Sequence, residues 1–209
     1  MSLKNKRILI TAGPTWVPMD SVRVISNIAS GETGILLAEK LSKEQAKVTL
    51  VLGPVERRGI DRRIRLVNFR FFEELRTRLK KELSSKKYDI VIHSAAVSDF
   101  RPEQPVKGKF SSGKAYELRL IPLAKIVTEI RRRAPEAKLV LFKLESGISD
   151  NLLIRRAKAA LADAGGDLVV ANRLIPRYKA YLLDEKKIYF QAASKEKLAQ
   201  ALVKRLALK

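Results

Sequence analysis

The chain has 209 residues and a net charge of +21, from 43 Lys and Arg against 22 Asp and Glu. It contains no cysteine and a single histidine, which excludes disulfide bonds, a cysteine nucleophile and a histidine-rich metal site. Hydrophobic residues make up 46% of the chain, no apolar run is long enough to cross a membrane, and the first residues lack the apolar core of a signal peptide. We therefore expect a globular cytoplasmic protein with no membrane association.

Strands are predicted where apolar residues run together, and helices where they recur at helical spacing. Buried strands are expected over residues 7–11, 47–52, 64–69, 88–93, 139–144 and 167–171. A short strand is expected around Leu118 and Leu120, and a hairpin over 179–183 and 186–191. Helices are expected over 34–45, 72–83, 122–133 with Pro122 in its first turn, 150–163, and from a cap at Ser194 to about 207.

The alternation of strands and helices predicts an α/β fold, a doubly wound and mostly parallel Rossmann-like sheet with helices on both faces. We expect one domain over residues 1–209, with a long loop or flap at 97–116 and the small hairpin as additions. Right-handed crossovers would place the strand-to-helix loops at one edge of the sheet. These loops are 12–15, 53–58, 94–101, 145–149 and 172–177.

Two loops of small residues lie near the start of the chain, at 12–15 and 26–31. The first follows a buried strand, and the second opens a helix. Backbone N–H groups can converge where side chains are small, and a helix N-terminus adds partial positive charge. The two loops predict a nucleotide site at the carboxyl edge of the first strand.

Six short motifs stand in order along nearly the whole chain. They are ITAGPT at 10–15, VRVISN and ASGETG at 22–27 and 29–34, AAVSDF at 95–100, KFSSG at 109–113, FKLE at 142–145 and VVAN at 169–172. In this order they resemble the phosphopantothenate–cysteine ligase family, also called phosphopantothenoylcysteine synthetase. Ala29 stands where the family has serine, which removes one possible phosphate-binding hydroxyl.

The resemblance implies a ligase of coenzyme A biosynthesis. In this family the carboxylate of 4′-phosphopantothenate attacks the α-phosphate of a nucleoside triphosphate, pyrophosphate leaves, and the amine of cysteine attacks the acyl-nucleotide. It also implies Mg²⁺, a homodimer and, for a chain of this length, a form free of the fused decarboxylase that many relatives carry. The nucleotide is CTP or ATP, because the chain mixes signatures of both, and no metal ligand is assigned.

The resemblance also implies roles for single residues. Asn27 is similar to the family's asparagine that holds the acyl-phosphate intermediate, and Lys109 to its catalytic lysine. Arg23, with Asn27, is expected to bind substrate. The expected nucleotide-binding residues are Gly13, Thr15, Ser30, Gly31, Ala95, Ala96, Asp99, Phe142, Lys143 and Asn172.

Several of these residues have a structural alternative. Asn27 is also typical of a helix cap, and Asp99 of a turn that bonds its own backbone. Lys107 competes with Lys109 for the catalytic role, although the distance from Asp99 favours Lys109. His93 stands in an apolar run and is interpreted as a buried histidine rather than a general base.

The remaining candidates have similar alternatives. Phe142 ends an apolar strand and would pack in the core, and Asn172 would simply end its strand. Arg23 would cap the loop that carries Asn27. Asp99, if it is functional, would contact the ribose, the base or a phosphate-bound Mg²⁺.

Two other classes of protein are open at this stage. A Rossmann-type oxidoreductase would need the Gly-x-Gly-x-x-Gly fingerprint after the first strand, where AGPT stands instead, and Pro14 lacks an N–H for a pyrophosphate. The charge would suit a nucleic-acid-binding protein, but aromatic residues are only 6% and do not alternate with the basic ones. Nucleic acid is therefore not the expected partner.

Overall fold

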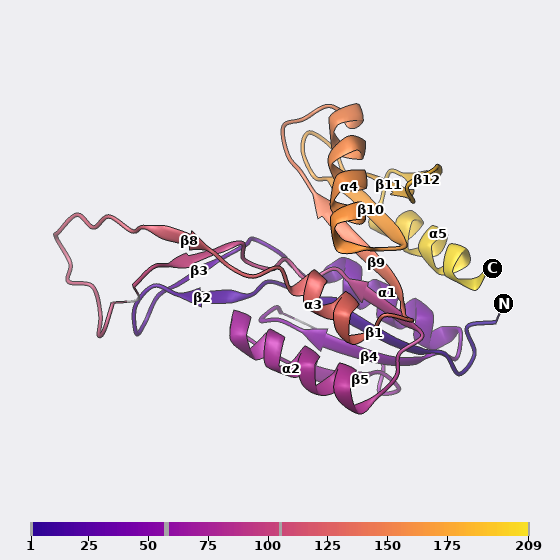
Figure 1. Ribbon diagram of the computed structural model, residues 1–209, viewed down its shortest axis with the longest axis horizontal. Helices are drawn as coiled ribbons and strands as arrows, with labels where there is room; N and C mark the ends of the chain where they lie inside the picture. Colours follow the sequence, from indigo (N-terminus) through magenta and orange to yellow (C-terminus); the bar gives the residue numbers. More distant parts are fainter. Residues whose placement is uncertain (1, 57–58, 105, 209) are drawn as a thin grey trace.

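The computed structural model describes residues 2–56, 59–104 and 106–208, and its centre is an eight-stranded sheet (Figure 1). The strand order is β12-β11-β10-β9-β6-β1-β4-β5. Six neighbouring strands pair in parallel: β1 (Arg7–Ala12), β4 (Lys47–Leu52), β5 (Arg65–Asn68), β6 (Ile90–His93), β9 (Lys138–Leu144) and β10 (Leu168–Arg173). This confirms the predicted doubly wound, mostly parallel α/β fold.

Helices cover both faces of the sheet. Helices α1 (Glu32–Lys43) and α5 (Lys195–Ala207) share one hydrophobic cluster with Ile8 and Ile10 of β1. On the other face, Leu9 of β1 belongs to a second cluster with α2 (Phe72–Ser85), α3 (Ile126–Arg133) and α4 (Asp150–Ala164). Because successive side chains of a strand point to opposite faces, the apolar run of β1 supplies both cores.

Serine side chains cap two of these helices. Ser149 Oγ accepts from the N–H of Leu152 at 3.3 Å at the start of α4. Ser194 Oγ accepts from the N–H of Lys197 at 3.2 Å at the start of α5, which confirms the predicted cap. No helix within the described ranges has both the length and the apolar character that a membrane crossing requires.

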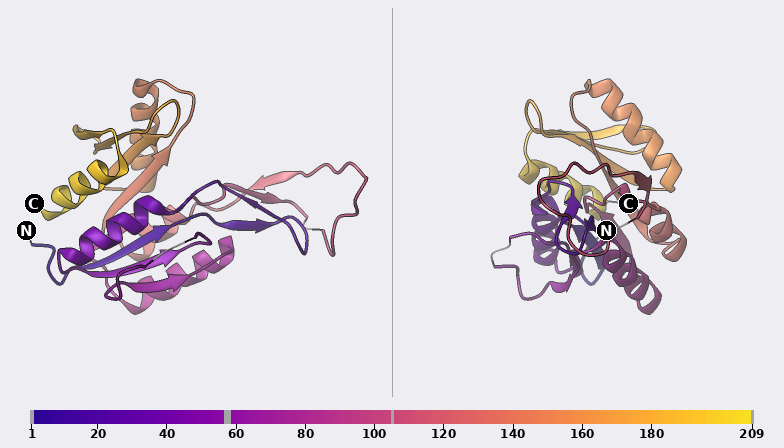
Figure 2. Two further views of the ribbon diagram at one scale, coloured as in Figure 1. Left: turned by 180° about the vertical axis from the view of Figure 1, so that it is seen from behind. Right: turned by 90° about the vertical axis from the view of Figure 1, so that its left-hand side faces the viewer.

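Two narrow ribbons extend away from the sheet as an arm, defined here as residues 16–26, 100–104 and 106–122 (Figures 1 and 2). β2 (Trp16–Pro18) pairs antiparallel with β3 (Val24–Ser26), and β7 (Phe100–Pro102) pairs antiparallel with β8 (Leu120–Pro122). The sequence predicts a flap over 97–116 but not the β2–β3 ribbon beside it.

Two predicted elements differ from the structure. Pro122 was expected in the first turn of a helix, but it ends β8 opposite Phe100, and α3 begins only at Ile126. The predicted hairpin does not stand apart from the sheet. Its strands β11 (Lys179–Leu183) and β12 (Ile188–Ala192) continue the central sheet in the antiparallel sense beyond β10.

Candidate functional site

Glycines bring three loops into contact at the carboxyl edge of the sheet. Gly13, after β1, has a φ of 80°, and a Cβ atom there would lie 3.2 Å from the backbone of Gly53, after β4. Gly31, before α1, has a φ of 69°, and its Cβ would lie 3.3 Å from the nitrogen of Gly13. The loops lie this close only because these positions carry no side chain and accept positive φ.

The start of α1 is held against the end of β1. A Cβ atom on Gly34 would lie 2.4 Å from Cβ of Ala12 and 2.9 Å from Oγ of Ser94. The cap residue of α1, Gly31, has no side chain to bond the first turn, and Ser30 Oγ makes only a long contact of 3.4 Å with the N–H of Glu32. The uncapped N–H groups of this turn suit an anion.

Asn27 joins the base of the arm to the loop after β6. Its side-chain Nδ2 donates to the carbonyl oxygens of Ala96 and Val97, both at 3.1 Å. Asn27 is exposed, and within the described part of the chain its Oδ1 accepts no hydrogen bond. It is not the cap of α1, since that position belongs to Gly31. These two hydrogen bonds hold the amide in this position, and its oxygen Oδ1 is free to accept a hydrogen bond from a ligand.

Thr15 is fully buried, and its hydroxyl is used inside the protein. Thr15 Oγ1 accepts from the N–H of Ser98 at 2.8 Å and donates to Ser98 Oγ at 3.1 Å. The backbone of Gly13 and Thr15 also bonds Ala96, at 2.9 and 3.3 Å. Thr15 therefore shapes the loop around Asn27, and its hydroxyl is not available to a ligand.

A second group of predicted residues lies on β9 and β10 at the same edge. The N–H of Glu145 donates to the carbonyl of Asn172 at 3.0 Å, and Lys143 Nζ lies 3.2 Å from Glu145 Oε1. Phe142 is half-buried and packs against the core cluster that contains Ile8 and Ile10. The prediction that Phe142 packs in the core is thus confirmed in part, because the residue packs against this cluster but stays partly exposed.

Charged residues near this edge are already paired. Asp99 forms an exposed ion pair with Lys125 at 2.5 Å, and Glu32 at the start of α1 pairs with Lys195. In residues 2–56, 59–104 and 106–208 no three His, Cys, Asp or Glu side chains gather closely enough to hold a metal ion. Lys125 and Lys195 were not predicted from the sequence. The chain has 43 Lys and Arg residues, and no motif distinguishes these two from the rest.

His93 is half-buried at the end of β6, so the prediction of a buried histidine is confirmed only in part. Its Nδ1 lies 2.8 Å from Thr11 Oγ1 on the neighbouring strand. Burial lowers the pKa of His93 to about 4, so the ring is neutral near pH 7.

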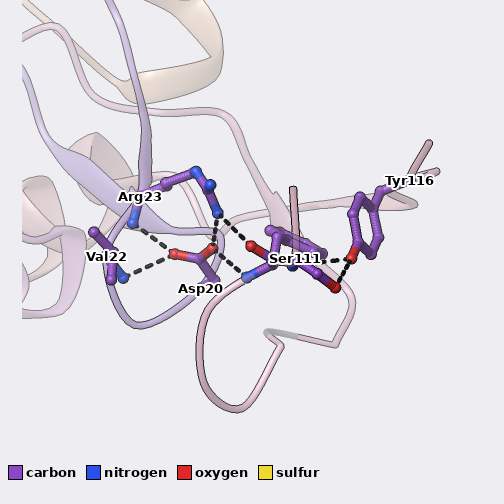
Figure 3. A network of polar contacts seen from close by, with 6 residues as sticks. Asp20, Val22, Arg23, Ser111 and Tyr116 are labelled. Carbon is purple, nitrogen blue, oxygen red and sulfur yellow. Dashed lines mark hydrogen bonds and ion pairs between the residues drawn. The ribbon is translucent and has the colours of Figure 1, made fainter. Parts of the chain in front are cut away.

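A buried carboxylate organises the tip of the arm (Figure 3). Asp20 Oδ1 accepts from the N–H groups of Val22 at 2.8 Å and Arg23 at 2.7 Å. Its Oδ2 accepts from the N–H of Phe110 at 3.0 Å and from Nη1 of Arg23 at 2.6 Å. The hydrogen bond from Phe110, helped by those from Val22 and Arg23, holds the pKa of Asp20 well below its usual range, although burial opposes this shift.

This network separates the predicted catalytic residues within one chain. Arg23 is bonded to Asp20 and lies over the ring of Phe110, 6.0 Å from its centroid, at the tip of the β2–β3 ribbon. Lys109, next to Phe110, is exposed beside this tip, whereas Asn27 lies at the base of the ribbon. The sequence analysis missed Asp20, although an aspartate three residues before an arginine in a turn is a recognisable signal.

The sheet topology defines a doubly wound α/β protein. The glycine loops and the uncapped helix suit the carboxyl edge of its sheet to binding anions. The chain belongs to the family described as the DNA/pantothenate metabolism flavoprotein C-terminal domain, whose model matches residues 3–208. The expectation of the phosphopantothenate–cysteine ligase family, made from the six motifs, is consistent with this membership and is confirmed at the level of the family.

Known proteins agree with this assignment. The chain is 38% identical over 174 residues to the coenzyme A biosynthesis bifunctional protein CoaBC of Thermococcus kodakarensis, covering 83% of this chain and 42% of that protein. Its fold is similar to that of the DNA/pantothenate metabolism flavoprotein from Streptococcus pneumoniae, with a TM-score of 0.85, 22% identity, and 96% and 98% of the two chains covered. It is also similar to the Cab2 mutant H337A in complex with phosphopantothenate-cysteine, with a TM-score of 0.78, 19% identity, and 97% and 86% covered.

The chain spans about half the length of the curated relatives it matches. Those relatives are bifunctional proteins, so their complete set of activities does not transfer to a chain of 209 residues.

Proposed function

We propose that this protein joins 4′-phosphopantothenate to L-cysteine, as a ligase of coenzyme A biosynthesis that uses a nucleoside triphosphate and releases pyrophosphate. The observation that carries the proposal is the convergence of Asn27, the loops at Gly13 and Gly31, and the loop at Ala95 and Ala96 on one edge of the sheet. Membership of the family and the complex of Cab2 with phosphopantothenate-cysteine support it.

In this proposal the protein binds and orients anions and does no covalent work of its own. The first turn of α1 and the loops around Gly13 and Gly31 hold the phosphates through backbone N–H groups. In the structure both N–H groups of Asn27 Nδ2 donate to the carbonyls of Ala96 and Val97. In this proposal Nδ2 turns to the reacting phosphate when the substrates bind, where an amide donor stabilises the phosphate without adding charge. The nucleotide extends along Ala95 and Ala96 towards Phe142, Lys143 and Asn172.

Mg²⁺ is proposed as the cofactor, and it would supply charge neutralisation on the triphosphate. No group of three ligating side chains is present in the described ranges, and Asp99 is a single carboxylate already bonded to Lys125. These residues fit Mg²⁺ held mainly by phosphate oxygens and water, with Asp99 as a protein carboxylate close to the loop after β6. CTP and ATP are both open as the co-substrate.

We further propose a homodimer in which the arm of one copy completes the site of the other. Lys109 and Asn27 lie at opposite ends of the same ribbon in one chain. The arm and its base also expose large apolar side chains, which is unusual for a surface that stays in water. They are Val22, Ile28, Phe100, Tyr116 and Leu120, which are 67%, 103%, 51%, 46% and 44% exposed.

The decisive experiment for the reaction is an assay of pyrophosphate release. The protein is incubated with 4′-phosphopantothenate, cysteine, Mg²⁺ and either CTP or ATP, and one pyrophosphate is expected for each amide formed. Release of orthophosphate and nucleoside diphosphate would contradict activation through an acyl-nucleotide. Light scattering tests the dimer, since a fully active particle of 23.5 kDa would exclude it.

Two alternatives have less support. A Rossmann-type oxidoreductase lacks its fingerprint at the loop after β1, where Pro14 offers no N–H. A nucleic-acid-binding protein would bind DNA or heparin with strong salt dependence and without ligase turnover. The cytoplasmic location and the single domain over 1–209 stay predictions.

A further inference from the structure

A cavity lies at the opposite edge of the sheet, where the parallel strands begin. Its volume is about 470 Å³, and residues at the starts of three strands line it: Arg7 of β1, Lys47 of β4 and Arg65 of β5. Arg63 and Lys86 add two further cationic side chains. The cavity has no part in the site at the carboxyl edge.

Cations outnumber carboxylates around this cavity. Arg65 and Lys86 share one carboxylate, that of Glu82, and Arg63 pairs with Asp61 at 2.6 Å. Within the described part of the chain, Lys47 makes no ion pair. Asp89, which accepts from the N–H of Arg7 and pairs with Lys6, is a third carboxylate close to the lining. Five lining cations therefore meet three nearby carboxylates, and the cavity keeps a positive excess.

Two of the guanidinium groups are held by carboxylates, one of them buried and the other half-buried. Glu82 is buried and accepts from the hydroxyl of Tyr88 at 2.8 Å, and Tyr88 in turn lies 3.2 Å from Thr49 Oγ1. Burial alone would raise the pKa of Glu82, but the hydrogen bonds from Arg65 and Tyr88 lower it, so Glu82 stays ionised and anchors Arg65.

Arg63 is anchored at the rim of the same cavity. Its Nε and Nη2 donate to Asp61, which also accepts from Ser42 Oγ at 3.1 Å. A guanidinium has five N–H donors, so Arg63 keeps donors for a ligand after bonding Asp61. Fixed donors of this kind lose little entropy when an anion binds.

The lining points to phosphate as the recognised group. Arginine forks suit phosphate oxygens, and several cations within one cavity suit adjacent phosphates. Tyr88 is buried and its hydroxyl is bonded, so the cavity offers no exposed ring on which bases of a nucleic acid strand would stack. A hollow lined by the starts of three strands also differs from the long basic groove that tracks a nucleic acid backbone.

We propose that this cavity is a second anion site, which binds the phosphate groups of a small oligophosphate such as pyrophosphate or the phosphate chain of a nucleotide. The site is separate from the carboxyl edge and does not depend on the proposed ligase activity. A ligand there contacts the starts of β4 and β5, whose other ends carry Gly53 and the loops of the first site.

Hydrogen–deuterium exchange with pyrophosphate as the probe tests this site. At low ionic strength, pyrophosphate is expected to slow exchange in peptides covering 45–49 and 63–66. The double variant Lys47→Gln/Arg63→Gln is expected to lose this protection and to weaken pyrophosphate binding at these peptides at least about tenfold. Unchanged exchange in the peptides of β1, β6 and β9 without pyrophosphate reports that the variant is folded, whether or not pyrophosphate binds at the carboxyl edge.

The matched control is Arg155→Gln/Lys158→Gln, which removes the same charge from α4 and is expected to keep the protection. Absence of protection at 45–49 and 63–66 in the wild-type protein would overturn the proposal, as would equal protection in the Lys47→Gln/Arg63→Gln variant. Protection by a single-stranded oligonucleotide but not by pyrophosphate would replace it with nucleic acid binding. Failure of the ligase assay leaves all of these outcomes readable, because none of them requires turnover.

Discussion

The carboxylate of Asp20 accepts a hydrogen bond from the backbone N–H of Phe110 at 3.0 Å, across 90 residues of sequence. This bond ties the turn between β2 and β3 to the segment that carries Lys109. Asp20 also bonds Val22 and Arg23, so one buried carboxylate fixes both sides of the tip of the arm. Replacing a charged acceptor that several N–H groups share costs stability, because all of these donors lose their partner at once.

The first prediction concerns Asp20→Asn. An amide keeps the size of the side chain but has only one acceptor oxygen and loses the charge, so the N–H groups of Phe110 and Arg23 can no longer both be satisfied. We expect amide exchange in the 106–116 segment to become at least about tenfold faster while the central sheet is unchanged. Exchange followed by mass spectrometry measures both regions in one experiment.

The control for Asp20→Asn is Glu103→Gln in the same arm. Glu103 is exposed and pairs with Arg119 at 3.5 Å, and exposed pairs of this kind contribute little. Exchange in the arm should therefore stay at the wild-type rate in Glu103→Gln. If both variants behave alike, Asp20 does not organise the tip.

A second prediction concerns the contact between α1 and the end of β1. Gly34→Ala would place a Cβ atom 2.4 Å from Cβ of Ala12, and both atoms belong to packed backbone segments. We expect a loss of about 1–3 kcal/mol in the free energy of unfolding, the usual cost of overpacking a core. Denaturant titration measures this loss. Thr33→Ala, one residue earlier in the same helix, should be nearly neutral, and a similar loss there would contradict the explanation.

The sequence predicts the central sheet well because its strands are buried on both faces. The runs of β1, β4, β6, β9 and β10 are mostly apolar, so the prediction of a strand depends little on the surrounding structure. The ribbons β2–β3 and β7–β8 are three residues per strand and largely exposed, so they have no such pattern. Pro122 shows why the boundary between β8 and α3 could not be predicted, because a proline suits both the start of a helix and the end of a strand.

The candidate site is predictable where backbone geometry decides it. Positive φ and close approach explain Gly13 and Gly31, and both are visible as small residues after a strand and before a helix. The bonds from Asn27 to Ala96 and Val97 are not predictable, because they join residues about 70 positions apart through a tertiary contact. The roles of these residues in the reaction stay predictions.

A third prediction concerns pH and His93. Burial lowers the pKa of His93 to about 4, below the ordinary value of about 6.5 that it regains on unfolding. Between these values the unfolded chain binds more protons than the folded one, so stability falls as the pH drops from about 6.5 towards 4. Unfolding free energies measured over this range should show a smaller decline for His93→Gln than for the wild-type protein. An identical decline in both would exclude His93 as its source.

A fourth prediction separates the two candidate lysines. If Lys109 balances charge during the reaction, Lys109→Gln should lower turnover about a hundredfold or more, the usual effect of removing one transition-state contact. Lys107→Gln is the matched control, because it removes the same charge two residues earlier in the same exposed segment. If Lys109 serves mainly the second step, mass spectrometry of quenched reactions should show acyl-nucleotide accumulating in Lys109→Gln with cysteine present. A crippled Lys107→Gln beside a near-normal Lys109→Gln would assign the role to Lys107.

The last prediction tests whether Lys109 acts in the site of a second copy. Asn27→Asp places a negative charge beside the phosphates and should abolish turnover without unfolding the protein, as circular dichroism can verify. Asn27 and Lys109 lie at opposite ends of the β2–β3 ribbon, so in the proposed homodimer one site would combine Asn27 of one copy with Lys109 of its partner. Mixing the inactive variants Asn27→Asp and Lys109→Gln, with exchange of subunits, would then create mixed dimers that have one site with both residues intact. Random exchange should restore about a quarter of the wild-type activity, because half of the dimers are mixed and each has one intact site. If both residues instead serve the site of their own chain, every site in the mixture lacks one of them, and activity stays at the level of the separate variants.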